Sequence, residues 1–212
     1  PKKRINSFLG KVYTINKYTN QYLHKESDLF FDWYLPLILN KKKAFSIKLR
    51  SKKFLSKIYK KLNFKNSYFV HRDFHVQNLM KVGKNIGILD SQDALIGNPA
   101  YDLVSLIDDV RIKSSKNLKK KIYNYYLKES PIHKIKSHQF LQDFNILSVQ
   151  RSLKIIGIFS RLFKRDQKKQ FLKLIPYTWR LLENRMNSKI FLELKNILDK
   201  NIPKKIRKKI LL

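Results

Sequence analysis

The feature that most constrains this chain is a short polar loop held between apolar segments near its middle. These segments have the length and the aromatic or β-branched composition of strands, and a turn signal divides the second one, as in a hairpin. The predicted strands are Tyr68–Val70, Leu79–Val82 and Ile86–Leu89, with the turn at Gly83–Asn85. His71–Asn78, called the polar loop below, is therefore not a strand, and Asp90 follows directly on the hairpin.

The polar loop and the residue after the hairpin carry the side chains that phosphoryl transfer requires. The loop begins with His71-Arg72-Asp73, and Asn78 lies five residues after the aspartate. One carboxylate must orient the acceptor hydroxyl and take its proton, while an amide oxygen and a second carboxylate hold the Mg²⁺ that bridges the ATP phosphates. We therefore predict a catalytic group of Asp73, as the base, with His71 and Arg72. Asn78 and Asp90 are the predicted Mg²⁺ and ATP-binding pair.

The spacing matches one part of the protein-kinase pattern and departs from the rest. Protein kinases have His-Arg-Asp, then Asn five residues after the Asp, and later Asp-Phe-Gly and Ala-Pro-Glu. Here Asp90-Ser91-Gln92 replaces Asp-Phe-Gly, and no Ala-Pro-Glu follows. His75 also stands where protein kinases usually have Lys. The chain is therefore not predicted to be an ordinary protein kinase.

Five segments carry a different likeness: Leu29–Tyr34, His71–Met80, Gly87–Ala94, Tyr101–Leu106 and Gln150–Phe159. Together they resemble the aminoglycoside phosphotransferase and choline kinase superfamily. They look closest to the bacterial cell-wall sugar kinases that phosphorylate N-acetylmuramate and N-acetylglucosamine at the anomeric position. The resemblance covers roughly residues 26–184. It implies an ATP- and Mg²⁺-dependent kinase that acts on a small-molecule hydroxyl, an amino sugar of cell-wall recycling.

Further site residues follow from this resemblance. Asp102 opens a predicted helix, where a plain N-cap is one interpretation; in the kinase-like fold the equivalent acid braces the catalytic loop from below. Possible contacts with the acceptor are His75, Asp93, Arg111, Arg151 and Lys154. For the three cations, a solvated helix face is an equally open alternative. His75 has the alternative of packing or hydrogen bonding within the loop.

The rest of the chain is predicted to be mainly helical. Apolar residues recur at helical spacing from Leu29 to Ile38, with Ser27 as the N-cap, and again from Phe54 to Leu62. No clear period is present before residue 26. Later helices are predicted at Tyr101–Ile112, Leu118–Leu127, Phe140–Phe163, Gln167–Glu183 and Lys189–Leu198. We expect an α+β fold, mainly α: the C-terminal lobe of a protein-kinase-like fold with a small β-hairpin element carrying the catalytic loop.

Charge sets this chain apart from most globular proteins. Its 212 residues include 47 Lys and Arg against 15 Asp and Glu, a formal net charge of +32. Such a field suits nucleic acid or an anionic surface. Lysines scattered over solvated faces are the favoured interpretation, because no RNA-binding or zinc-finger motif accompanies them. The field also argues against polycationic aminoglycosides as acceptors and favours a neutral or anionic sugar.

The parts that would complete a nucleotide site are absent from this sequence. Only five glycines occur, none in a Gly-x-Gly-x-x-Gly pattern, and no Val-Ala-Ile-Lys-like strand precedes the polar loop. We therefore expect residues 1–212 to be the C-terminal catalytic lobe, with the N-terminal ATP-binding lobe of the same polypeptide missing. A basic nucleic-acid-binding module and a kinase-like pseudoenzyme are the alternative functions. Without cysteine or a long apolar run, a cytoplasmic protein with no membrane partner is expected.

Overall fold

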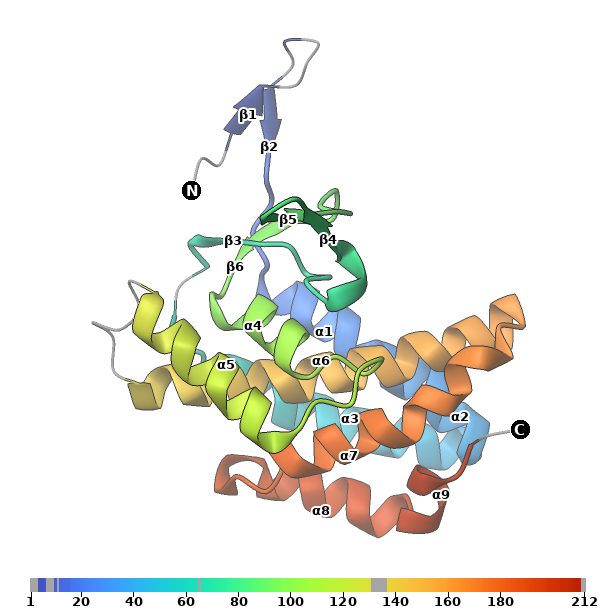
Figure 1. Ribbon diagram of the computed structural model, residues 1–212. Coiled ribbons are helices and arrows are strands. Elements are labelled where there is room, and N and C mark those ends of the chain that lie inside the picture. The colour runs from blue at the N-terminus through green and yellow to red at the C-terminus, as the bar shows by residue number, and fades with distance from the viewer. Residues whose placement is uncertain (1–3, 7–9, 11, 65, 131–136, 211–212) are drawn as a thin grey trace. The chain divides into compact units, whose positions relative to one another are not determined.

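The computed structural model describes residues 4–6, 10, 12–64, 66–130 and 137–210. These residues are mainly helical and include small two-stranded antiparallel sheets, as expected for an α+β protein that is mainly α (Figure 1). Two compact units divide the chain, and each is built from two separate stretches of sequence. One unit consists of Pro1–Thr19 and Leu62–Leu147, and the other of Asn20–Lys61 and Ser148–Leu212.

The first unit holds the strands and the polar loop. The strand pairs are β1 (Arg4–Asn6) with β2 (Val12–Thr14), β3 (Tyr68–Val70) with β6 (Leu95–Gly97), and β4 (Leu79–Val82) with β5 (Asn85–Ile88). The predicted strands are therefore present, with β5 shifted by one residue. No strand is predicted at β6, because three residues before Asn-Pro are too few to show a period. β6 pairs with β3 and so fixes the point at which the polar loop begins.

The hairpin of β4 and β5 leaves its apolar side chains in contact with solvent. Its turn is Gly83-Lys84, where Gly83 has a φ of 58°, a left-handed conformation that glycine adopts without steric cost. Large apolar side chains on the hairpin and directly after it are about half exposed or more: Met80, Val82, Ile86, Ile88 and Leu89. The β4–β5 hairpin is thus formed by backbone pairing and its turn more than by burial of its side chains.

A buried carboxylate organises the helical part of the first unit. This part contains η2 (Val76–Asn78), α4 (Ala100–Ile107), α5 (Lys116–Glu129) and the beginning of α6 (Ser137–Asp166). Asp143 of α6 is fully buried and accepts hydrogen bonds from the backbone N–H groups of Asn63 and Phe64 and from the Asn98 amide, at 2.7–3.1 Å. The Asn98 side-chain oxygen accepts in turn from the Ala100 N–H, at the start of α4. Asp143 therefore holds the residues that begin α4.

The described residues of the second unit form helices without strands. Besides the rest of α6, these are α1 (Asn20–Leu29), the π-helix η1 (Phe30–Tyr34), α2 (Leu35–Ile38), α3 (Lys41–Tyr59), η4 (Lys169–Leu174), α7 (Ile175–Arg185), η5 (Lys189–Phe191), α8 (Leu192–Asn201) and α9 (Lys204–Lys208). None of these or of the other described helices combines the length and the apolar character needed to cross a bilayer.

Two predicted helix starts are wrong. Ser27 is not an N-cap, because it lies inside α1 and its hydroxyl donates to the His24 carbonyl at 3.2 Å. The second helix begins at Lys41 instead of near Phe54, and the Asn40 side chain caps it by accepting from the Lys43 N–H at 2.9 Å. Both errors have one cause: the first turns of these helices are rich in polar and charged residues, which carry no apolar period.

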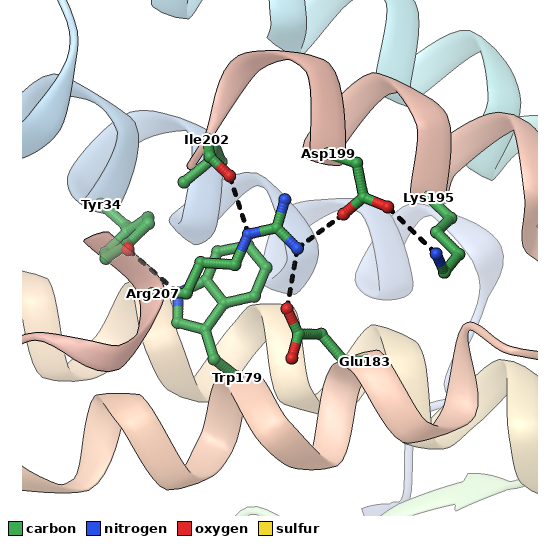
Figure 2. Close-up of polar contacts among 7 residues, drawn as sticks. All are labelled: Tyr34, Trp179, Glu183, Lys195, Asp199, Ile202 and Arg207. Carbon is green, nitrogen blue, oxygen red and sulfur yellow. Dashed lines mark hydrogen bonds and ion pairs between the residues drawn. The ribbon is translucent and has the colours of Figure 1, made fainter. Parts of the chain in front are cut away.

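A buried arginine fastens the last helices of the second unit (Figure 2). Arg207 of α9 is 2% exposed, and its guanidinium lies over Trp179 of α7, 4.9 Å from the ring centroid. It forms ion pairs with Glu183 and Asp199 at 2.8 and 2.7 Å. The Trp179 indole N–H donates to the Tyr34 hydroxyl, and burial raises the pKa of Tyr34 to about 12. Because a buried charge needs its partners, this cluster ties α7, α8 and α9 together.

At one position α6 lies so close to the junction of α1 and η1 that only glycine fits. A Cβ atom on Gly157 would collide with the backbone carbonyl carbon of Leu29 and would lie 2.5 Å from the backbone nitrogen of Phe30. Backbone atoms cannot be rotated away like the end of a side chain, so the helices would have to separate. Phe30 is fully buried at this contact, and separation would open a gap in a close-packed core.

Gly157→Ala should therefore destabilise the protein by roughly 1–3 kcal/mol, the usual cost of overpacking. This steric cost opposes the ~1 kcal/mol by which alanine normally improves a helix interior. Urea unfolding of the full-length protein measures the difference. Gly87→Ala is the matched control, since its Cβ would make an ordinary 3.4 Å contact with Val82. Equal stability of the two variants would contradict the close approach of α6.

Candidate active site

One carboxylate of α4 anchors the beginning of the polar loop. The two oxygens of Asp102 accept hydrogen bonds from the backbone N–H groups of His71, at 2.7 Å, and Arg72, at 3.0 Å. This is the contact expected from the resemblance, and it is made by a side chain in the first turn of α4. Arg72 has a φ of 73°, a left-handed conformation that costs a non-glycine residue about 1 kcal/mol or more. The paired hydrogen bonds offset that cost and hold the loop in its turn.

The His71 ring links the polar loop to the segment that leads to Asp90. His71 is 3% exposed, and its Nε2 lies 2.8 Å from the backbone carbonyl oxygen of Leu89. Because a carbonyl oxygen only accepts, Nε2 carries the proton and donates it. The other nitrogen, Nδ1, is buried and has no hydrogen-bond partner among the described residues. A ring in this position orients the backbone next to Asp90, so its geometry suits positioning more than proton transfer.

The Arg72 side chain reaches the same segment from the other side. Its guanidinium donates to the backbone carbonyl of Asp93 at 3.0 Å and lies 5.6 Å from the centroid of the Tyr18 ring. Tyr18 packs edge-on against Tyr101, which is fully buried at the start of α4. Arg72 therefore joins the polar loop to the residues after the hairpin, while the Asp93 residue itself remains exposed.

Hydrogen bonds to backbone carbonyls link Asp73 to Asn78, and Asn78 to Leu89, the residue before Asp90. The Asp73 carbonyl accepts from the His75 N–H and from the Asn78 side-chain amide, both at 2.9 Å. The Asn78 carbonyl accepts from the Leu89 N–H at 2.9 Å, just beyond the paired strands β4 and β5. Asn78 is therefore bonded to the loop on one side and to the neighbour of Asp90 on the other.

The side-chain oxygen atoms of Asn78 and Asp90 are suitable ligands for a hard cation. The Asn78 amide nitrogen donates to the Asp73 carbonyl, so the amide oxygen is the atom that would be available to a metal ion. Asp90 is exposed in a left-handed conformation, with a φ of 68°, and one of its oxygens accepts from the Gln92 side chain at 2.8 Å. Mg²⁺ prefers oxygen ligands and is commonly held by one or two side chains together with substrate phosphates. A neutral amide oxygen and a carboxylate fit that ion.

The remaining predicted site residues are divided between the two units. His75 is 8% exposed and lies inside the polar loop, and Arg111 follows α4 in the same unit. Arg151 and Lys154 belong to the α6 part of the second unit and are also buried, 5% and 8% exposed. There Lys154 forms an ion pair with Glu26 at 3.0 Å, so its charge already has a partner.

Two acidic residues after α4 are additions that sequence reasoning did not single out. Asp108 is 3% exposed and pairs with Lys119 at 2.9 Å. Asp109 is 2% exposed, and one of its oxygens accepts from the backbone N–H of Val76 in the polar loop, at 3.4 Å. The available signal was an acidic pair directly after an apolar helix, in a chain with only 15 acidic residues.

A cavity lies beside the polar loop but does not contain the predicted chemistry. Its volume is about 550 Å³, and its walls come from β3, α4 (including Asp102) and α5 together with Phe74, Pro99 and Ser130. Asp73, Asn78 and Asp90 do not line it. Large mainly apolar cavities are common ligand sites, but the predicted base and metal ligands are not among the residues that line this one. We therefore locate the candidate active site at the polar loop and the hairpin end, not in this cavity.

Asp102→Ala should destabilise the full-length protein by roughly 2–4 kcal/mol, because two backbone donors and a strained Arg72 lose their partner. Asp32→Ala provides a matched control: Asp32 is also an aspartate in the first turn of a helix, but its side chain is 46% exposed and pairs with Lys48. Exposed pairs contribute about 1 kcal/mol or less. Urea unfolding compares the two variants. An equal loss of stability in both would show that Asp102 contributes no more than an exposed acid.

Comparison with known proteins gives the chain its family. Residues 24–134 match the phosphotransferase enzyme family. An N-acetylmuramate/N-acetylglucosamine kinase of Pseudomonas aeruginosa is 34% identical over 170 residues, which are 78% of this chain and 50% of that protein. Kinases of the same name from Neisseria meningitidis and Caulobacter vibrioides are each 32% identical, over 76% and 66% of this chain and 49% and 39% of their own length.

The chain spans about half the length of the Pseudomonas and Neisseria relatives and less of the Caulobacter one. The family match itself covers just over half of the 212 residues and includes the polar loop, the β4–β5 hairpin and Asp102. The residues that form the candidate site thus lie within the matched range. This chain belongs to the phosphotransferase enzyme family.

Proposed function

We propose that this chain is the catalytic lobe of an ATP-dependent kinase that phosphorylates a hydroxyl of a small molecule, with Asp73 as the base. The observation that carries the proposal is the state of Asp73. Its backbone carbonyl is held by two hydrogen bonds, whereas its half-buried carboxylate accepts none from the described residues. A carboxylate that extends from a held backbone and has no hydrogen-bond partner of its own is suited to accept a proton from a bound hydroxyl.

The proposed reaction assigns a separate task to each side chain. The acceptor oxygen forms a bond to the γ-phosphorus of ATP, the bond from that phosphorus to the ADP oxygen breaks, and the hydroxyl proton passes to Asp73. Asn78 and Asp90 would hold Mg²⁺, which neutralises charge on the phosphates when it is bound. His71 and Arg72 keep the loop and the Asp90 segment in register, through the bonds to Leu89 and Asp93.

An N-acetylated amino sugar is the acceptor that we propose. The relatives from Pseudomonas, Neisseria and Caulobacter are named as kinases of N-acetylmuramate and N-acetylglucosamine. The charge of this chain supports the same choice, because a net charge of +32 repels polycationic acceptors and slows their encounter. N-acetylglucosamine is neutral and N-acetylmuramate is an anion, so neither meets that barrier.

The proposal includes a nucleotide-binding lobe outside residues 1–212. A kinase of this type needs a Gly-rich loop over the phosphates and a lysine that contacts them, and the sequence has no Gly-x-Gly-x-x-Gly pattern. We propose that the full-length polypeptide supplies both from an N-terminal lobe, and that residues 1–212 supply the base and the metal ligands. Activity measurements therefore use the full-length protein.

Asp73→Asn should lower kcat by roughly 10²–10⁴-fold with little change in ATP affinity, the usual contribution of a positioned base. Asparagine keeps the size of the side chain but cannot take a proton. Steady-state kinetics with ATP varied at a fixed sugar concentration separate the two quantities. Asp166→Asn changes the same group at the end of α6, where the carboxylate pairs with Arg165, and is expected to keep wild-type rates. If Asp73→Asn kept the wild-type kcat, Asp73 would not be the base.

A panel of acceptors tests the substrate class. N-acetylmuramate and N-acetylglucosamine should have higher kcat/KM values than kanamycin, choline or a protein acceptor, each measured with ATP and Mg²⁺. Preference for kanamycin or choline would overturn the amino-sugar assignment and leave the kinase assignment intact. No phosphorylation of any acceptor, together with salt-dependent nucleic-acid binding that survives Asp73→Asn, would favour a basic binding module instead.

A further inference from the structure

Asp109 is a buried acid that joins the polar loop to a cation. It lies just past the end of α4 and is 2% exposed. One oxygen accepts from the Val76 N–H at 3.4 Å, and the other accepts from the Arg111 N–H at 3.0 Å and lies 3.6 Å from Nη1 of the Arg111 guanidinium. Burying a carboxylate is costly unless donors and a cation lie near it, and Asp109 has two backbone N–H donors and the Arg111 guanidinium.

The Arg111 side chain contacts one carboxylate and is partly exposed to solvent. Its side chain is 27% exposed, and Asp109 is its carboxylate partner among the described residues. A guanidinium has five N–H donors in a planar fork, so a single 3.6 Å contact leaves most of them unused. A fork that a buried carboxylate already orients loses less freedom when it binds an anion, which favours two parallel bonds to a carboxylate or phosphate.

The cation is coupled to the same loop that carries Asp73. Val76, which Asp109 contacts, lies three residues after Asp73. The loop between them is compact, because the His75 N–H donates to the Asp73 carbonyl and the Asn78 N–H donates to the His75 carbonyl, both at 2.9 Å. Asp109 therefore fixes the guanidinium of Arg111 relative to a loop whose own bonds fix Asp73.

The other two cations suggested by the sequence lack this combination. Lys154 is 8% exposed and already paired with Glu26, so its charge has a fixed partner. Arg151, on α6, is 5% exposed. Arg111 is the cation of the three that is both partly exposed and bonded, through Asp109, to the polar loop.

We propose that Arg111, oriented by Asp109, binds the carboxylate of an acidic amino sugar and thereby sets a preference for N-acetylmuramate over N-acetylglucosamine. The inference rests on the proposed function. The two sugars share the N-acetylated ring, and N-acetylmuramate adds a lactyl ether that ends in a carboxylate. Arg111 is thus a specificity residue and Asp109 a positioning residue, and neither takes part in proton transfer.

The test compares kcat/KM for the two sugars in the full-length enzyme. Arg111→Gln should lower the value for N-acetylmuramate roughly 10- to 100-fold, the effect of one charge-assisted hydrogen-bonded pair. The loss should appear mainly in KM, because the carboxylate is bound equally in the ground and transition states. N-acetylglucosamine should be affected less than about 3-fold, since it offers no anion to the guanidinium. Arg111→Lys should restore part of the loss, because it keeps the charge but not the fork.

Asp109→Asn separates positioning from structure. Asparagine still offers an oxygen to one N–H but removes the charge that orients Arg111. The kcat/KM for N-acetylmuramate should therefore fall less than in Arg111→Gln, and again more than the value for N-acetylglucosamine. Arg180→Gln is the control for the general field: Arg180 is exposed on α7, stacked on Tyr177, and the change removes the same charge. Both sugars should be used by Arg180→Gln as by the wild type.

The possible results distinguish this inference from the function on which it rests. If Arg111→Gln lowers kcat/KM equally for both sugars, or for neither, Arg111 does not bind the carboxylate and the inference is overturned. If Asp109→Asn lowers kcat for both sugars alike, Asp109 serves the loop and not the cation. If the wild-type enzyme phosphorylates neither sugar, the proposed function fails first and this inference fails with it. Thermal unfolding of each variant checks that the fold is kept.

Discussion

The candidate site depends on a carboxylate that meets two consecutive backbone N–H groups. Asp102 accepts from His71 and Arg72, and this pair of bonds stabilises the left-handed turn through which the polar loop departs from β3. Without that turn the loop would continue as an extended strand, and Asp73 would have no fixed position relative to Asn78. A helix supplies the acid because a helix is rigid, and α4 is buried along most of its length. The proposed base lies on a loop, but its position depends on a side chain of a neighbouring helix.

Three of the 15 acids of this basic chain hold backbone segments in place. Asp143 fixes Asn98 and so the start of α4, Asp102 fixes the start of the polar loop, and Asp109 contacts Val76 at the other end of the loop. Each accepts hydrogen bonds from N–H groups, which is the arrangement that makes the buried charges of Asp143 and Asp109 tolerable. A surface dominated by lysine therefore coexists with an interior that uses aspartate for positioning. Selection on the two sets can differ, because lysines on solvated faces contribute little to stability.

The local part of the site could be predicted and the long-range part could not. The strands around the polar loop follow from short apolar runs and a Gly turn, and Asp73, Asn78 and Asp90 stand out by spacing alone. The partner of Asp102 lies about 30 residues away in sequence, so no periodicity reveals it; only the family resemblance suggested the contact. Neither periodicity nor the family resemblance pointed to Asp143 or Asp109. The helix starts at Asn20 and Lys41 were missed for a related reason, since polar first turns have no apolar pattern.

The apolar β4–β5 hairpin has a consequence for how the protein behaves in solution. A two-stranded sheet has two unpaired edges, and edges flanked by exposed apolar side chains such as Met80, Ile86 and Ile88 can pair with those of another molecule. At low ionic strength the charge of +32 keeps copies apart by mutual repulsion. At physiological salt that repulsion fades beyond about 8 Å. Colloidal stability of this chain thus falls as salt is added, and dilute buffer favours the monodisperse state.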